Sequence, residues 1–221
     1  MSNNLFAQRS YTQNSVLATG NWIKIGVTQS GLYKVDASFL IANGFGSNIP
    51  SNAIRLYGNG GRMLSEANND LYVDDLIENA IEIVDDGDGI FNKNDYFLFY
   101  GTETSEQIFD SLNRTFYYKK NLYSDTSYYF ISAGGLGKRV LQKINNAVAV
   151  ETISSYDDFF HHEIDAVNLL NSGKEWVGEN FSSNQLVQNY TIESFGRIVS
   201  EPIIITTKIV GRSVVTNSAI Q

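Results

Sequence analysis

Short apolar runs separated by turn residues fill this chain of 221 residues, and they limit its fold more than any other feature. Residues 21–27 alternate between apolar and polar side chains, which is the period of a β-strand. Residues 96–100 (YFLFY) are apolar throughout and too few for a helix, which predicts a buried strand. Further strands are expected at residues 32–35, 53–57, 76–84, 116–120 and 128–132. The pattern predicts a mainly β protein with antiparallel sheets, arranged as a sandwich or like a barrel.

Two local features refine this expectation near the N-terminal end. A four-residue turn, Thr28-Gln29-Ser30-Gly31, separates two predicted strands, which favours a hairpin. Asp36 then has the short carboxylate of a helix N-cap. A short helix is expected to follow it and to end at Gly44, in the left-handed conformation.

A second, longer helix is predicted between Ser155 and Gly173. Ser155 would cap its start, and Asp158 would lie near the positive end of the helix. Apolar residues recur there at the spacing of one helical face, namely Phe160, Ile164, Val167 and Leu170. The expected architecture is therefore antiparallel sheets with one short and one long helix packed on them.

Composition suggests three regions along the chain. Residues 1–19 are polar and are expected to be a flexible leader segment, without the apolar core of a secretory signal. Residues 20–183 would form an N-terminal β-rich domain. After Asn184 the chain changes to β-branched runs, which predicts strands at the start of a truncated second β-domain over residues 184–221 (Ile198-Val199, Ile203-Ile204-Ile205, Ile209-Val210 and Val214-Val215).

Charge and composition exclude several classes of function. The chain has no cysteine, so a thiolate nucleophile and Cys-ligated zinc are excluded, and its two histidines exclude a three-His metal site. The formal net charge is −8, and residues 66–110 hold thirteen acids and one base, so binding to nucleic-acid phosphates is not expected. No apolar run approaches the roughly 18 residues that a membrane helix needs.

The acidic turn between residues 84 and 96 is the best candidate for a metal site. With Gly89 at the sixth position of a calcium loop, Asp86, Asp88 and Asp95 occupy ligand positions three, five and twelve. Val84 occupies the first position and cannot bind an ion, although a shifted turn would let Asp85 replace it. Calcium is therefore the one cofactor considered, and an Asp/Gly-rich turn without metal is the favoured interpretation.

Other motifs give weaker signals. His161 and His162 are adjacent, so they cannot chelate one ion as an i, i+4 pair does, and a hydrogen-bonded or packed role is favoured. The run of residues 134–138 (GGLGK) lacks the first glycine and the final Ser or Thr of a phosphate loop, which indicates a plain turn. Tryptophan rings stack on sugars in some proteins, but burial in the hydrophobic core is their more usual role. The core role is therefore the favoured one for Trp22 and Trp176.

Five segments, in order and spacing, resemble a known family. The most specific parts are Tyr-Gly-Asn-Gly-Gly at residues 57–61 and Trp-Val-Gly-Glu-Asn-Phe at residues 176–181; Arg62 departs from the expected third glycine. The five segments are residues 20–36, 54–66, 85–101, 123–132 and 161–181. They are similar to the N-terminal region of the gingipain-like cysteine peptidases that act as sortases of the type IX secretion system.

This resemblance implies a location at the extracellular face of the outer membrane and a non-catalytic role. The catalytic His and Cys of such sortases lie in a later domain, so no catalytic residue is carried over to this chain. The implied partners are the chain's own downstream peptidase domain and outer-membrane secretion subunits. Two alternatives stay open: an independent calcium-assisted carbohydrate-binding or adhesive surface module, and, less favoured, a stand-alone hydrolase.

Overall fold

The computed structural model describes residues 11–65, 67, 70, 73–144, 147–148, 150–169, 171 and 175–211. Backbone contacts divide the chain into two compact units, Met1–Thr152 and Ile153–Gln221. All named helices and strands belong to the first unit. None of the helices in the described part of the chain is long and apolar enough to cross a membrane.

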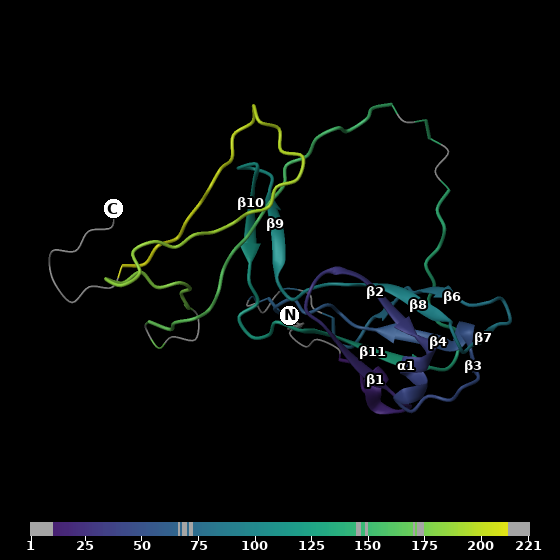
Figure 1. The fold of residues 1–221 in the computed structure, drawn as a ribbon. Coiled ribbons are helices and arrows are strands. Elements are labelled where there is room, and N and C mark those ends of the chain that lie inside the picture. The colour runs from purple at the N-terminus through teal and green to yellow at the C-terminus, as the bar shows by residue number, and fades with distance from the viewer. Residues whose placement is uncertain are drawn as a thin grey trace, which may run out of the picture. The chain divides into compact units, whose positions relative to one another are not determined.

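The first unit is built mainly from antiparallel strands, as the alternating pattern predicted (Figure 1). Its strands are β1 (Ile23–Val27), β2 (Gly31–Asp36), β3 (Ile49–Pro50), β4 (Ile54–Tyr57), β5 (Glu78–Asn79), β6 (Glu82–Val84), β7 (Ile90–Phe91), β8 (Tyr96–Gly101), β9 (Glu106–Asp110), β10 (Thr115–Lys119) and β11 (Ser127–Ala133). The helical elements are α1 (Ala37–Ala42) and two 3-10 turns, η1 (Val16–Ala18) and η2 (Ser51–Ala53).

Two sheets form the body of this unit. One has the strand order β1-β11-β4-β5 and the other the order β2-β8-β6, while β3 pairs with β7. Strands β9 and β10 pair with each other as a separate hairpin. Among the described residues no sheet closes on itself, so of the two expected arrangements the sandwich is the one formed.

The core lies between the two sheets and follows from their alternation. In β8, Phe97 and Phe99 are buried at 0% and 2% exposure, whereas Tyr100 points outward and is 63% exposed. Phe99 packs against Tyr129 of β11, with ring centroids 5.2 Å apart, which joins the two layers. The run YFLFY is thus a strand with one buried face rather than two.

The predicted hairpin between residues 21–27 and 32–35 is wrong, although both strands are present. Strand β1 pairs with β11, and β2 pairs with β8, so the turn between them carries the chain from one sheet to the other. The local turn signal cannot specify this, because the partners that bury these strands come from about 65 to 105 residues further along the chain.

The predicted short helix is confirmed as α1. Asp36 occupies its N-cap position, but its carboxylate makes no capping hydrogen bond; it forms an ion pair with Lys34 at 2.7 Å instead. Gly44 follows the helix with a φ of +96°, as expected of a C-terminal glycine. Leu40 anchors the helix in the core at 1% exposure.

The predicted long helix after Ser155 is wrong. Residues 153–166 contain no helix or strand, and Val167 instead forms an antiparallel bridge with Val177. Phe160 and Ile164 are 55% and 44% exposed, so the apolar face found in the sequence packs on no core. Most helical stability in proteins comes from such packing, and Asp, Phe, His and β-branched residues are weak helix formers. Leu170 and Gly173 lie outside the described residues.

The strands predicted after Asn184 are not formed in the described part of that segment. Residues 186–211 contain neither helix nor strand, and their β-branched residues stay exposed, Ile204 at 88% and Ile205 at 75%. Strands need paired neighbours, and the described residues supply none here. Val214 and Val215 lie outside the described residues, and the predicted domain boundaries stay predictions.

Candidate functional site

The acidic turn joins β6 to β7, and its carboxylates bind the backbone of the turn itself. Asp86 Oδ1 accepts a hydrogen bond from the amide of Asp88 at 3.3 Å, and Asp88 Oδ1 accepts one from Ile90 at 2.7 Å. Gly87 and Gly89 supply left-handed φ values of +91° and +76°. These are turns in which an aspartate side chain replaces a backbone carbonyl, and they account for the Asp/Gly composition without an ion.

Asp95 lies apart from the exposed end of the turn and is buried at 6% exposure. Its Oδ2 accepts a hydrogen bond from the amide of Asn92 at 2.7 Å, and its carbonyl accepts one from Ala37, the first residue of α1, at 2.9 Å. Asn92 also donates through its side chain to Asp88 at 3.4 Å. Asp88 and Asp95 therefore share one partner, while Asp86 bonds only within the turn.

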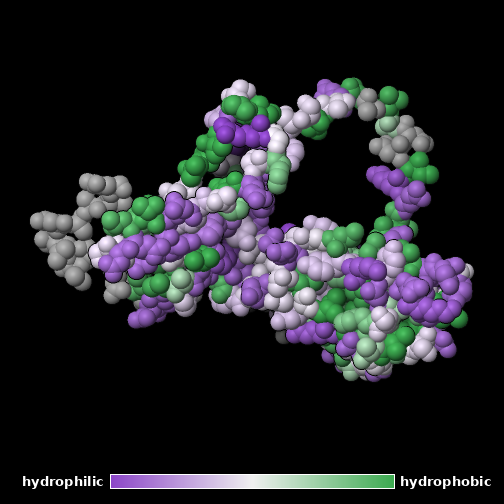
Figure 2. Space-filling model, viewed as in Figure 1, coloured by the Kyte–Doolittle hydropathy of each residue, from purple (hydrophilic) through white to green (hydrophobic). Residues whose placement is uncertain are grey.

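The calcium site expected from the sequence stays a prediction. In the part of the chain that is described, no three His, Cys, Asp or Glu side chains are grouped so as to hold a metal ion. Figure 2 shows a strongly hydrophilic surface at the end of the sandwich where β6 and β7 lie in Figure 1. Such a surface attracts cations in general, even where no ligand set is assembled.

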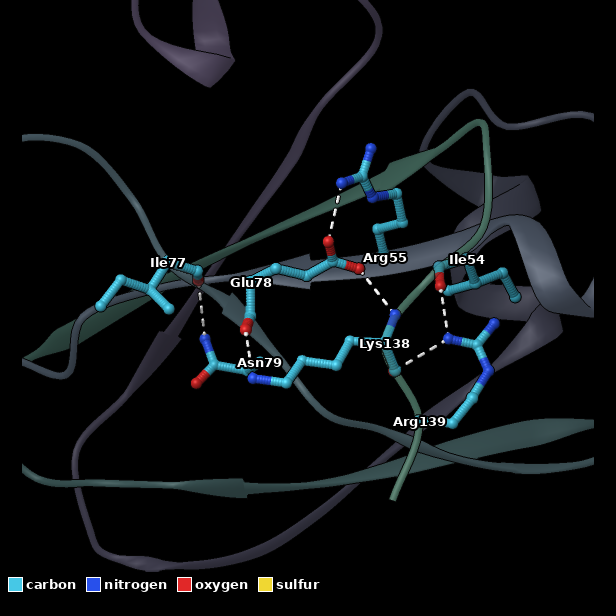
Figure 3. A network of polar contacts seen from close by, with 7 residues as sticks. All are labelled: Ile54, Arg55, Ile77, Glu78, Asn79, Lys138 and Arg139. Atoms are coloured by element: carbon cyan, nitrogen blue, oxygen red, sulfur yellow. Dashed lines mark hydrogen bonds and ion pairs between the residues drawn. The ribbon is translucent and has the colours of Figure 1, made fainter. Parts of the chain in front are cut away.

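A polar network that sequence analysis missed joins β4, β5 and the chain after β11 (Figure 3). Arg55 of β4 and Glu78 of β5 form an ion pair at 2.7 Å. Glu78 also accepts the backbone N–H of Lys138 at 2.7 Å. Arg139 donates to the carbonyls of Ile54 and Ser51 at 3.0 and 2.8 Å. One carboxylate and one guanidinium thus tie the chain after β11 to the start of β4.

The same network settles the role of the GGLGK run. The amides of Gly134, Gly137 and Lys138 donate to Ala53, Asn52 and Glu78 respectively, so these groups are engaged within the protein. A Cβ on Gly137 would lie 2.1 Å from the carbonyl oxygen of Ile54, which requires glycine there. These contacts give the run a structural role, in line with the predicted plain turn.

Opposing effects act on the pKa of Glu78 in this network. Burial acts against its ionisation, but the hydrogen bonds from Arg55 and Lys138 and the charges of Arg55 and Arg139 together lower its pKa. Burial, followed by the charge of Glu78, raises the pKa of the neighbouring Tyr57. These shifts follow from a structural ion pair, and the network contains no nucleophile beside a base.

The Tyr-Gly-Asn-Gly-Gly run has a packing role. A Cβ on Gly58 would lie 2.5 Å from the ring of Tyr129, and one on Gly61 would lie 2.3 Å from the hydroxyl of Ser127. Asn59 between them accepts a hydrogen bond from Ile77 at 2.8 Å and donates to the carbonyl of Asp75 at 3.0 Å. The run lets the chain pass closely over β11 while its asparagine holds the segment before β5.

Asp75 in turn holds the described part of the predicted leader. Its carboxylate accepts hydrogen bonds from the Ser15 hydroxyl at 2.8 Å and the Val16 amide at 2.7 Å. The hydrogen bond from Ser15, with those from Leu76 and Val16, lowers the pKa of Asp75. Asp75 therefore joins the N-terminal segment to the Tyr-Gly-Asn-Gly-Gly loop.

The two histidines lie in the second unit, and each contacts a glutamate. His161 Nε2 lies 3.0 Å from Glu163 Oε2, and His162 Nε2 lies 2.5 Å from Glu179 Oε1. The expected hydrogen-bonded role is therefore present, although no helix carries it. Glu179 belongs to the Trp-Val-Gly-Glu-Asn-Phe run, and only the resemblance singled that run out.

The fold and sites together define an antiparallel β-sandwich unit with structural polar networks, followed by a loop-rich unit. No protein-family model matches the chain, and no curated protein matches it. Among solved structures, the chain is similar to PorU from Porphyromonas gingivalis, seen in a crystal structure of its dimeric latent form. The identity is 29% and the TM-score 0.48, over 62% of this chain and 12% of that one. The chain thus spans a small part of the PorU chain.

Proposed function

We propose that this chain is the non-catalytic N-terminal scaffold or docking region of a cell-surface type IX secretion sortase. The observation that carries the proposal is the order and spacing of the five resembling segments over residues 20–181. In this proposal the peptidase domain follows the region along the same chain, and outer-membrane secretion subunits are its further partners.

The roles of the resembling segments support a scaffold. Residues 54–66 and 85–101 supply β4, the glycine-rich crossing, the acidic turn and β8, all of which build the sandwich. In the described residues these segments form packing contacts and structural ion pairs rather than a nucleophile held beside a base. The chain has no cysteine, so the thiolate of a cysteine peptidase must come from residues beyond it.

The proposal predicts that the purified chain does not turn over peptide or ester substrates. Incubation with both substrate classes, followed by chromatography, measures this directly. The matched variants are His161→Ala and His162→Ala, since these are the two histidines of the chain. Turnover that disappears in either variant would make the chain a hydrolase and would remove the scaffold proposal.

The gene supplies an independent test. Under the proposal, the reading frame continues beyond Gln221 and encodes a His…Cys pair in a gingipain-like domain. In the longer protein, destabilising the sandwich through Leu40→Ala should reduce the yield of active peptidase. Leu32→Ala serves as the control, because the Leu32 side chain faces outward and is 69% exposed. A reading frame without such a pair, or equal activity in both variants, would contradict the proposal.

A further inference from the structure

The sequence contains the dipeptide Asn-Gly twice, at Asn43-Gly44 and at Asn59-Gly60. In this dipeptide the backbone nitrogen readily attacks the preceding side chain, because glycine has no side chain to shield its nitrogen and has the greatest backbone freedom. Whether the attack happens in a folded protein depends on how firmly the local backbone and the asparagine amide are held. The two sites differ in this respect, so the chain contains its own comparison.

Asn59 is fixed between two parts of the chain. Its Oδ1 accepts a hydrogen bond from the Ile77 amide at 2.8 Å, and its Nδ2 donates to the Asp75 carbonyl at 3.0 Å. A Cβ on Gly60 would lie 2.8 Å from the hydroxyl of Thr102, so this glycine is closely packed. Bringing the glycine nitrogen to the asparagine side chain therefore requires two hydrogen bonds between distant segments to break.

Asn43 is exposed, and its hydrogen bonds within the described part of the chain all lie at the end of α1. Its Nδ2 donates to the carbonyl of Phe39 at 2.8 Å, four residues earlier. The amide of Gly44 donates to Ile41 at 3.2 Å, and a Cβ on Gly44 would meet no atom within 4 Å. Helix ends fray, so opening of this single turn frees both the side chain and the glycine nitrogen.

We propose that Asn43 is a site of spontaneous covalent modification, in which its side-chain amide is lost as ammonia. The Gly44 nitrogen gives its proton to water and attacks Cγ of Asn43, and the bond between Cγ and Nδ2 breaks. Nδ2 takes a proton from water and leaves as ammonia, and a five-membered succinimide ring remains in the backbone. Water then opens either carbonyl of the ring, which gives aspartate or isoaspartate. The net reaction consumes one water and releases one ammonia.

The product changes the end of α1. A carboxylate replaces the group that donates to the Phe39 carbonyl, so a hydrogen bond becomes a contact between two acceptors. The new negative charge also lies at the C-terminal end of a helix, where the free carbonyl groups disfavour it. Leu40, three residues earlier, anchors the helix in the core at 1% exposure. The modification therefore loosens the helix end beside a core position.

Ageing of the purified full chain tests the proposal. The chain is kept under mildly alkaline conditions for several days and digested with trypsin, and its peptides are compared by mass spectrometry with a sample digested at the start. Trypsin separates the two sites, because its cuts leave Asn43 in peptide 35–55 and Asn59 in peptide 56–62. We expect the mass gain of deamidation to appear roughly tenfold faster in the first peptide, the ratio given by two hydrogen bonds of ordinary strength.

Two controls separate the effect of structure from that of sequence. In concentrated urea both Asn-Gly sites lose their hydrogen bonds, so their rates should become similar. Asn43→Gln should remove the mass gain from peptide 35–55, because attack on glutamine requires a less favourable six-membered ring. This variant assigns the gain to residue 43 rather than to Asn48 or Asn52, which lie in the same peptide.

Four results would overturn the proposal. They are a rate at Asn59 equal to or above that at Asn43 in the folded chain, no reaction at Asn43 in the folded chain, a rate ratio that persists in urea, and a mass gain that persists in Asn43→Gln. Success or failure here leaves the scaffold proposal unaffected, because that proposal depends on the resembling segments and on the gene.

Discussion

Some side chains in short strands join segments that the strand pairing alone does not connect. Glu78 lies in a two-residue strand, yet it binds Arg55 in the neighbouring strand and the backbone of Lys138. Its side chain is 19% exposed, so loss of its charge leaves the Arg55 guanidinium without its closest compensation. A polar residue in so short a strand gives no pattern that sequence analysis can detect.

We predict that Glu78→Gln makes the sandwich less stable at neutral pH by about 1–3 kcal/mol, the usual cost of breaking a partly buried charged hydrogen bond. Because the pKa of Glu78 is lowered in the folded state, its contribution is present above the pKa of the unfolded state. It is lost as the pH falls through the lower, folded-state pKa.

Urea titrations from pH 7 down to about pH 3 measure this effect, and Glu82→Gln on an exposed position is the control. The Glu78→Gln protein should show a smaller decline in stability with acid than the unmodified chain. Parallel curves for the two proteins would mean that the ion pair contributes no stability.

The acidic turn leads to a prediction about calcium at the same scale. Asp86, Asp88 and Asp95 already accept hydrogen bonds from backbone amides, and Val84 removes one ligand position. We expect calcium to bind in the range of about 10⁻⁴–10⁻³ M or not at all. Calorimetric titration of the chain and of Asp88→Ala measures this. Submicromolar binding lost in the variant would instead favour the carbohydrate-binding or adhesive module.

The two predicted helices differ in whether their apolar face meets a core. The short helix α1 and the predicted long helix have similar sequence signals, namely an acidic or polar cap, an apolar spacing and a closing glycine. Leu40 in α1 packs into the core at 1% exposure, while Ile164 is 44% exposed. Burial of the apolar face, which the local sequence does not report, separates the two cases.

This difference predicts unequal effects of two similar truncations. Leu40→Ala should lower the free energy of unfolding by about 2–5 kcal/mol, because it leaves a cavity in a closed core. Ile164→Ala should lower it by about 0.5 kcal/mol or less, as is usual for a surface position. The fluorescence of Trp22 in the first unit and Trp176 in the second follows guanidinium unfolding of each. A large loss for Ile164→Ala would mean that its face is buried after all.

The two units differ in how many of their described backbone groups are hydrogen-bonded in paired strands. Strands of the first unit pair along complete registers, such as the six residue pairs between β2 and β8. Residues 186–211 of the second unit contain no strand, and their β-branched side chains are exposed. Residues 186–211 therefore lack the strand pairing that slows amide exchange in the first unit.

Hydrogen exchange over the whole chain should report this contrast. We expect amides of residues 186–211 to exchange close to their intrinsic rates, while those of β8 stay protected to near the global stability. Mass spectrometry of peptides from the two regions at neutral pH gives the comparison within one sample. Equal protection in both regions would place residues 186–211 in a paired sheet. Protection gained only in a longer gene product would support the predicted second β-domain.

Sequence by itself determined the fold class, the positions of most strands and the short helix, because alternation, aromatic runs and turn residues act over a few neighbouring positions. It also determined that residues 134–138 form a turn, since the missing Ser or Thr is a local fact. Only the tertiary structure decided that β1 and β2 lie in different sheets, that Glu78 holds Lys138, and that residues 153–166 are not helical. Each of these depends on which distant segment buries a face or supplies a partner, and spacing along the chain carries no information about that.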